Sequence, residues 1–190
     1  MKTLIIVDCQ NDFVLQGAPL HVEGASEAVT KIAELLSTGV IDNVIFTVDW
    51  HPSNHCSFKE NGGTWPTHCV AYTKGASICD ILYLKCDELR IPYQVLEKGA
   101  DKSVEEYGAV SEIKDKRTHY ELHSKCDLVF LNKRTEVIVC GVAGDYCVLE
   151  TLKQLKPFYP KVYVDGVASI DGGEKLNTYM SDNNINKFQK

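Results

Sequence analysis

The chain has 190 residues, of which 44% are hydrophobic and 24% are charged, with a formal net charge of −6. This length suits one α/β domain with a substantial core, and no Pro/Gly/Ser-rich stretch or charge run indicates a linker, so we expect a single domain over residues 1–190. Acidic and basic residues are interspersed, which excludes a phosphate-backbone partner such as nucleic acid. The composition is compatible with small ligands that are uncharged or weakly charged.

The N-terminal segment runs from Met1 directly into a short apolar stretch that ends at Asp8. This stretch is too short for a secretory signal with its cleavage site, or for a membrane span. We therefore expect a soluble, cytoplasmic protein with no membrane partner, and a homo-oligomer is compatible with the sequence.

Buried strands and amphipathic helices alternate along the chain. The hydrophobic pattern predicts, in chain order, a strand over 4–7, a helix over 26–37, a strand over 44–48, a helix over 78–89, a strand over 93–96, a helix over 122–131, a strand over 137–140, a helix over 148–155 and a strand over 162–164. The strands are short and almost continuously apolar, which is typical of a parallel sheet covered on both faces. We expect an open, doubly wound α/β sheet with helices on both faces.

Two local features complete this prediction. Ser26 is the expected N-cap of the first helix, with Glu27 in its first turn. The tail from Asp182 is polar and rich in asparagine, and we expect a frayed end or a surface loop there.

Cysteine is frequent, with eight residues, but the chain contains no CxxC pair and no secretory signal. We expect reduced thiols, most of them small core residues. The set comprises Cys9, Cys56, Cys69, Cys79, Cys86, Cys126, Cys140 and Cys147.

The predicted strands end in polar or reactive groups, and in a sheet of this kind ligands bind beyond the carboxyl ends of the strands. These end groups are Asp8, Asp49 with His51, Lys98, the turn before Cys147, and Asp165. The topology therefore predicts an active site built from these residues.

Cys147 follows a buried strand and a glycine-bearing turn, at the expected start of a helix. The helix dipole favours a thiolate there, and a nucleophilic cysteine also needs a cation or a base nearby. Asp8 can take the thiol proton if burial raises its pKa, and Lys98 can balance the charge. The alternative is that Asp8 caps a turn, Lys98 is solvated and Cys147 belongs to the core.

A second group of residues suits a divalent metal ion. Asp49 and His51 lie two apart, so in an extended strand they project to one side, and His55 and His68 follow in the next segment. A carboxylate with imidazoles suits Zn²⁺, Fe²⁺ or Mn²⁺, and three protein ligands leave open positions for a substrate. The alternative is that His51 and His55 lie in a loop and His68 forms a hydrogen bond in the core.

Several ordered motifs resemble those of the isochorismatase-like cysteine hydrolases, and the metal-binding set is similar to that of the nicotinamidases within them. The motifs are residues 7–13 (VDCQNDF), 49–52 (DWHP), 65–69 (WPTHC), 97–99 (EKG) and 141–148 (GVAGDYCV). The resemblance implies a catalytic triad of Asp8, Lys98 and Cys147.

The same resemblance implies further roles. One divalent ion, with zinc expected first and iron or manganese as alternatives, would be held by Asp49, His51 and His68. The pocket around a flat aromatic ring would be walled by Phe13, Trp65 and Tyr107. A cis peptide between Val142 and Ala143 would direct the backbone N–H groups of Ala143 and Cys147 at an oxyanion.

The chain also departs from the family pattern. Gly144 stands where relatives usually carry threonine, which would loosen the turn, and Cys9 replaces a plainer apolar residue beside the base. His55 is a candidate for a fourth ligand or for a residue that supports the ligands.

The activity implied is hydrolysis of the small molecule nicotinamide to nicotinate and ammonia, through a cysteine thioester, with the metal anchoring the pyridine ring. One alternative is a related amidohydrolase of the same superfamily that acts on a carbamoyl, ureido or other amide compound. Another is a non-catalytic module, stabilised by the metal, in which the cysteines sense oxidants.

Overall fold

A computed structural model describes residues 1–110, 120–123, 128–131 and 134–189, and its centre is a parallel five-stranded sheet. The order is β3-β2-β1-β6-β7, and the strands are β1 (Lys2–Val7), β2 (Asn43–Asp49), β3 (Tyr93–Lys98), β6 (Glu136–Gly141) and β7 (Lys161–Val167). Each predicted strand lies within one of these. The chain begins in the middle of the sheet, builds one half, and then crosses β1 to build the other, which confirms the doubly wound architecture.

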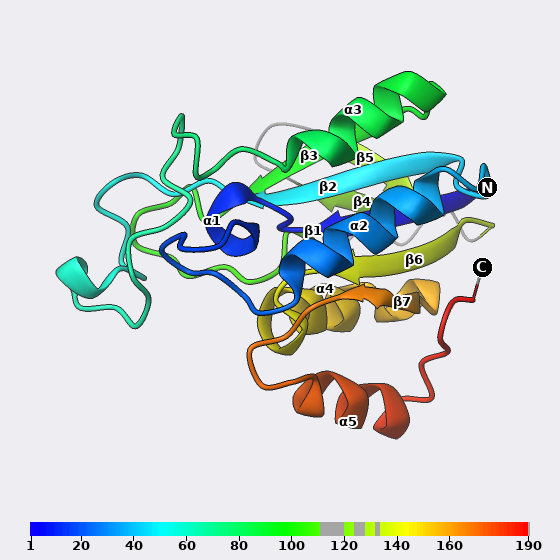
Figure 1. Ribbon diagram of the computed structural model, residues 1–190. Helices are drawn as coiled ribbons and strands as arrows, with labels where there is room; N and C mark the ends of the chain where they lie inside the picture. The colour runs from blue at the N-terminus through cyan, green and yellow to red at the C-terminus, as the bar shows by residue number, and fades with distance from the viewer. Residues whose placement is uncertain (111–119, 124–127, 132–133, 190) are drawn as a thin grey trace.

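Two apolar layers cover the two faces of the sheet. Side chains alternate along β1, so Leu4 and Ile6 enter one buried cluster while Ile5 and Val7 enter the other. The first cluster packs against α2 (Ala25–Leu36) and α3 (Asp80–Leu89), and the second against α4 (Leu149–Gln154) and α5 (Glu174–Asp182). Figure 1 shows α2 crossing in front of the sheet, with both chain ends at the edge opposite the long loops.

Helix α2 illustrates how the sequence specifies these layers. Its buried residues recur every three or four positions, as in Ala25, Val29, Ile32 and Leu36, which forms one apolar stripe. The prediction that Ser26 caps this helix was wrong, because the helix begins one residue earlier, after a left-handed Gly24. The Ser26 hydroxyl instead donates to the carbonyl oxygen of Val14, which ties α2 to the short helix α1 (Asn11–Val14).

The predicted helix over 122–131 was also wrong. Residues on both sides of its middle form the antiparallel strands β4 (Tyr120–His123) and β5 (Leu128–Leu131), in which Leu122 is paired with Val129. The apolar residues that suggested a helical stripe also fit the two-residue period of short strands, and pairing between the strands decided the outcome. Residues 124–127 lie outside the described part of the chain.

The C-terminal segment is held against the sheet. The N–H of Val162 donates to the carbonyl oxygen of Asn186, and the N–H of Phe188 donates to that of Val162. Of the two expected forms of this tail, the frayed end was wrong, because residues 186–188 pair with β7. Two short 3₁₀ turns complete the description, η1 (Lys59–Asn61) and η3 (Lys156–Phe158).

Each described cysteine carries a free thiol, as expected, and Cys126 lies outside the described residues. Within the described ranges, no helix combines the length and the apolar character that crossing a membrane requires.

Gly141 ends β6 at the point where this strand lies against β1, and its φ is +116°. A Cβ there would lie 2.6 Å from the Val7 nitrogen and closer still to its carbonyl oxygen, so a side chain would push the two central strands apart. We expect Gly141→Ala to lower the free energy of unfolding by about 1–3 kcal/mol more than Gly17→Ala, measured by urea unfolding. Gly17 is the control because its φ is +80° and the space around it is open. Equal losses in both variants would contradict this explanation.

Candidate active site

The strand ends bring the predicted residues together. Asp8 follows β1, Asp49 is the last residue of β2, and Lys98 is the last residue of β3. Asp49 and Lys98 are register partners in their parallel pair, so the sheet itself sets their spacing. Cys147 reaches the same edge from the turn that follows β6.

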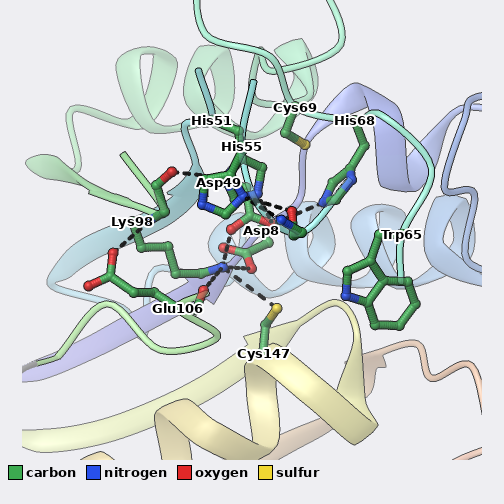
Figure 2. Close-up of polar contacts among 12 residues, drawn as sticks. Asp8, Asp49, His51, His55, Trp65, His68, Cys69, Lys98, Glu106 and Cys147 are labelled. Atoms are coloured by element: carbon green, nitrogen blue, oxygen red, sulfur yellow. Dashed lines mark hydrogen bonds and ion pairs between the residues drawn. The ribbon is translucent and has the colours of Figure 1, made fainter. Parts of the chain in front are cut away.

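The ammonium group of Lys98 is the centre of this cluster (Figure 2). Its Nζ lies 2.8 Å from Oδ2 of Asp8 and 3.6 Å from Sγ of Cys147, and it forms a close ion pair with Oδ1 of Asp49. All these side chains are buried. The interpretation of Asp8 as a turn cap and Lys98 as a solvated side chain is therefore wrong.

The carboxylate of Asp8 is held from both sides. The hydroxyl of Thr47, on the neighbouring strand, donates to Oδ1 at 2.7 Å, while Oδ2 faces the ammonium of Lys98. The backbone of Asp8 has a φ of +48°, in the left-handed region that costs a non-glycine residue about 1–3 kcal/mol. This turn directs the side chain off the end of β1 and into the cluster.

Burial sets the protonation of Asp8 and Cys147. Burial raises the pKa of the Asp8 carboxyl, and the positive charge of Lys98 opposes this only in part. Burial also raises the pKa of the Cys147 thiol well above its usual value; Lys98 opposes this rise and the nearby carboxylates add to it. Burial and the two carboxylates thus act on the thiol in the direction opposite to that expected of the helix dipole. A protonated thiol beside a carboxylate of raised pKa suits proton transfer between them.

Lys98 and Asp49 form the charged pair of the site. Burial alone would raise the pKa of Asp49, but the positive charge of Lys98 and the two nearby histidines hold it well below its usual value. Burial alone would lower the pKa of Lys98, but Asp49 and Asp8 hold it well above its usual value. Both groups are therefore ionised around neutral pH.

Asp49, His51 and His68 form a buried cluster of metal-ligand type, with ligand atoms within 4.8 Å of one another. Oδ2 of Asp49 lies 3.7 Å from Nε2 of each histidine. The other ring nitrogen is already engaged, because Nδ1 of His51 contacts the Gly99 carbonyl oxygen at 2.9 Å and Nδ1 of His68 contacts that of Pro66 at 2.7 Å. These contacts place the protons on Nδ1 and leave both Nε2 lone pairs for a metal ion.

His55 is differently placed. Its Nδ1 lies 2.7 Å from the Ser57 hydroxyl and its Nε2 lies 3.0 Å from the Val104 carbonyl oxygen. The ring stacks on His51, with centroids 4.1 Å apart. His55 therefore supports the position of His51, while both of its nitrogens have protein partners.

Asp8, Asp49 and Cys147 also lie within metal-ligand distance of one another. The Lys98 ammonium contacts all three, so a positive charge already occupies the space between them. The donor set of Asp49 with the two histidines is thus the one that fits a metal ion.

A cavity opens between the thiol and the histidine cluster. It is lined by Phe13, Leu20, Val22, Asp49, Trp65, His68, Glu105, Tyr107, Ala143, Tyr146, Cys147 and Ile170. The Cys147 sulfur and two residues of the cluster of metal-ligand type, Asp49 and His68, thus share one space.

Aromatic rings form one side of this cavity. The indole N–H of Trp65 donates to the Tyr107 hydroxyl at 3.1 Å, and both rings contact Tyr146, with centroids 5.0 Å and 5.6 Å away. Phe13 contacts the ring of His68 with a centroid distance of 5.4 Å. These flat walls suit a planar aromatic ligand.

The family model described as the Isochorismatase domain matches residues 2–98 of the chain. The nicotinamidase of Saccharomyces cerevisiae is 31% identical over 179 residues, which cover 80% of this chain and 79% of that protein. The chain belongs to the isochorismatase family.

Solved nicotinamidase structures are similar to the chain in fold. The yeast nicotinamidase Pnc1p, bound to the inhibitor nicotinaldehyde, is similar with a TM-score of 0.78 and 27% identity, covering 100% of both chains. PnC1 from L. infantum, in complex with nicotinate, also has a TM-score of 0.78 and 27% identity, covering 99% of this chain and 92% of that one. The fold inferred from the motifs is therefore confirmed.

The departures from the isochorismatase family pattern have local explanations. A Cβ at Gly144 would overlap the Ser169 hydroxyl, so this hydroxyl fills the space that a larger residue would need. Cys9 is buried in the core, and burial raises the pKa of its thiol well above the usual value, so it remains a neutral packing group. The peptide between Val142 and Ala143 is cis, as the resemblance implies.

Some contributors were absent from the sequence prediction. The side chain of Gln10 exchanges hydrogen bonds of 2.8 Å with the backbone N–H and carbonyl of Asp49, which fastens the end of β1 to that of β2. Tyr146 and Ile170 line the cavity. Tyr146 lies within the motif over 141–148, directly before Cys147, which is a signal for a role in the site, whereas no pattern marks Ile170. Asp165 was wrongly placed at a strand end, because β7 continues past it to Val167 and its side chain is exposed.

Gly99 allows His51 to approach the end of β3. Its φ is +67°, and a Cβ there would lie 2.5 Å from Nδ1 of His51. We expect Gly99→Ala to displace this ring and to weaken zinc binding about 10–100-fold, measured by competition with a chelator. Gly39→Ala is the control, because Gly39 has a φ of +72° with open space around it. Unchanged zinc affinity in Gly99→Ala would contradict a ligand role for His51.

Proposed function

We propose that this protein is a nicotinamidase, which hydrolyses nicotinamide to nicotinate and ammonia and so returns the ring to pyridine nucleotide synthesis. We assign the activity to one hydrolase domain over residues 1–190, acting in the reducing environment of the cytoplasm. The observation that carries the proposal is a buried Cys147 thiol, beside Asp8 and Lys98, in one aromatic cavity with two of the metal-ligand residues. The names of the relatives, and the nicotinate and nicotinaldehyde bound in two solved structures, support the substrate.

In the first half-reaction, Asp8 takes the proton of the Cys147 thiol and the sulfur attacks the carboxamide carbon. The backbone N–H groups of Ala143 and Cys147 hold the oxyanion that forms on the carbonyl oxygen. Asp8 then gives the proton to the amide nitrogen, the C–N bond breaks, and ammonia leaves. The product is a thioester on Cys147.

In the second half-reaction, Asp8 takes a proton from a water molecule, whose oxygen attacks the thioester carbon. The C–S bond breaks, the proton held by Asp8 returns to the sulfur, and the carboxylic acid product gives its own proton to the released ammonia, so that nicotinate and ammonium result. Lys98 remains an ammonium throughout, holds the Asp8 carboxylate in place, and balances the negative charge that moves between oxygen and sulfur. The site returns to its starting state with one water consumed.

Asp49, His51 and His68 are the residues we assign to a single divalent ion, with zinc as the first choice and iron or manganese as alternatives. When bound, the ion supplies a ligand position for the pyridine nitrogen and so orients the ring. We assign the faces of the pocket to Phe13 and Trp65, with Tyr107 holding the indole N–H of Trp65. Together these contacts point the carboxamide at the sulfur.

The thiol is tested by Cys147→Ala. The metal-replete wild-type protein is expected to release ammonia and nicotinate in equal amounts from nicotinamide. The variant is expected to release none while retaining its bound metal, because the attacking atom alone is missing. Cys56→Ala, which removes a thiol outside the cavity, is expected to keep wild-type activity.

Two outcomes would contradict the proposal. Ammonia release by Cys147→Ala would remove the thiol from the mechanism. Hydrolysis of carbamoyl or ureido compounds, with nicotinamide left intact by the wild-type protein, would indicate a different amidase.

The base is tested by Asp8→Asn. An amide cannot take the thiol proton, so we expect acyl-enzyme formation to slow by about 10²–10⁴-fold in a single-turnover burst measurement. Thr47→Val is the matched comparison, because it removes the hydrogen bond to Oδ1 but leaves the carboxylate. We expect a smaller loss in this variant, and an undiminished burst in Asp8→Asn would show that another group is the base.

A further inference from the structure

The loop after β7 is fastened to the turn that carries the nucleophile. The Gly144 N–H donates to the Ala168 carbonyl oxygen at 2.8 Å, and the Ala168 N–H donates to that of Gly141 at 3.3 Å. One step further along, the Ile170 N–H donates to Oδ1 of Asp145 at 2.9 Å. Residues 168–170 therefore follow the turn that leads to Cys147.

The turn is shaped to receive this segment. Gly144 has no side chain, and a Cβ there would overlap the Ser169 hydroxyl and lie 2.9 Å from Cγ1 of Val167. The missing side chain lets residues 167–169 lie directly against the helical turn Gly144–Val148.

Asp145 is a buried carboxylate two residues before the nucleophile, with only 4% of its surface exposed. Its described partner is the backbone N–H of Ile170. A backbone N–H needs an acceptor oxygen and not a negative charge, so an amide side chain at position 145 could serve equally well. Our mechanism gives this buried carboxylate no role in proton transfer.

Ile170 is a large apolar side chain that remains 51% exposed although it lines the cavity. Leu20 and Val22 add aliphatic surface to the same cavity, in contrast to the aromatic rings of Trp65 and Tyr107. An exposed side chain at a cavity lining lies at its mouth, where it can contact the part of a ligand that extends outward.

We propose that Ile170 determines which ring substituents the site accepts, and that Asp145 is the positioning residue that holds Ile170 at the mouth. This inference rests on the proposed function. The substrates concerned are uncharged planar aromatic carboxamides, and Ile170 limits the bulk that their rings carry toward solvent.

The first experiment compares nicotinamide with a pyridine-3-carboxamide that carries a bulky ring substituent. In Ile170→Ala we expect the ratio of kcat/KM for the bulky amide to that for nicotinamide to rise by at least ~10-fold, since single apolar groups in a pocket discriminate by this amount. For nicotinamide itself, KM is expected to rise while kcat stays within about twofold, because a ground-state contact is lost. Ile81→Ala is the matched control, since Ile81 is 47% exposed on α3 and lies outside the cavity lining.

The second experiment tests the positioning role without using activity. Hydrogen exchange of residues 168–173 is expected to accelerate in Asp145→Ala, which lacks the acceptor, and to stay close to wild type in Asp145→Asn, which keeps it. The amide ratio, which is kcat/KM for the bulky amide divided by kcat/KM for nicotinamide, is expected to rise in Asp145→Ala and to return to the wild-type value in Asp145→Asn. If Asp145→Ala does not fold, the Ile170→Ala ratio and the Asp145→Asn exchange rate decide the question.

The outcomes separate this inference from the proposed function. Wild-type turnover of nicotinamide, with an amide ratio that Ile170→Ala leaves unchanged, overturns the inference and leaves the function standing. Exchange in Asp145→Asn as fast as in a variant without the acceptor overturns the positioning role. A wild-type protein that releases no ammonia from nicotinamide overturns the function, and the specificity role of Ile170 with it.

Discussion

A single buried ammonium holds this site together. Desolvating a charge costs several kcal/mol unless partners replace the lost water, and Lys98 has two carboxylate partners, Asp8 and Asp49. The pairing of β2 with β3 sets Asp49 opposite Lys98, so the sheet register and the charge balance depend on each other. The thiol of Cys147 enters this cluster from the other half of the sheet. Nζ of Lys98 thus connects the strand pairing of the fold with the reacting groups of the site.

The two carboxylates differ because their surroundings differ. Asp49 has the close ion pair with Lys98 and faces two histidines, and these contacts keep it charged despite burial. Asp8 accepts a hydrogen bond from the neutral hydroxyl of Thr47 and shares the same lysine. Burial and the negative charge of Asp49 raise its pKa, and Lys98 opposes this only in part. One carboxylate is suited to hold cations, the other to exchange a proton with Cys147. Two identical groups on neighbouring strands therefore acquire separate tasks.

The sequence predicted the parts of the molecule that follow from local periodicity. The first three apolar strand runs end at the same edge of the sheet, so the sequence alone placed Asp8 and Lys98 beside one another. The stretch 122–131 was assigned wrongly because a short apolar pattern fits a helix or a pair of strands equally well, and only pairing between strands decides. Ile170 was missed because its position depends on hydrogen bonds to a distant turn, which no sequence spacing encodes. The burial of Cys147 could not be predicted from its neighbours in the sequence, because distant segments of the chain produce it.

The pairing of residues 186–188 with β7 has a consequence for the behaviour of the molecule in concentrated solution. β7 is an edge strand of the sheet. An edge strand presents unpaired N–H and C=O groups, with which a strand of a second molecule can form hydrogen bonds. Residues 186–188 form hydrogen bonds with Val162 and so cover part of the β7 edge. Proteolytic removal of residues 186–188 would expose the unpaired edge of β7. We expect such a protein to aggregate more readily while its active site stays intact.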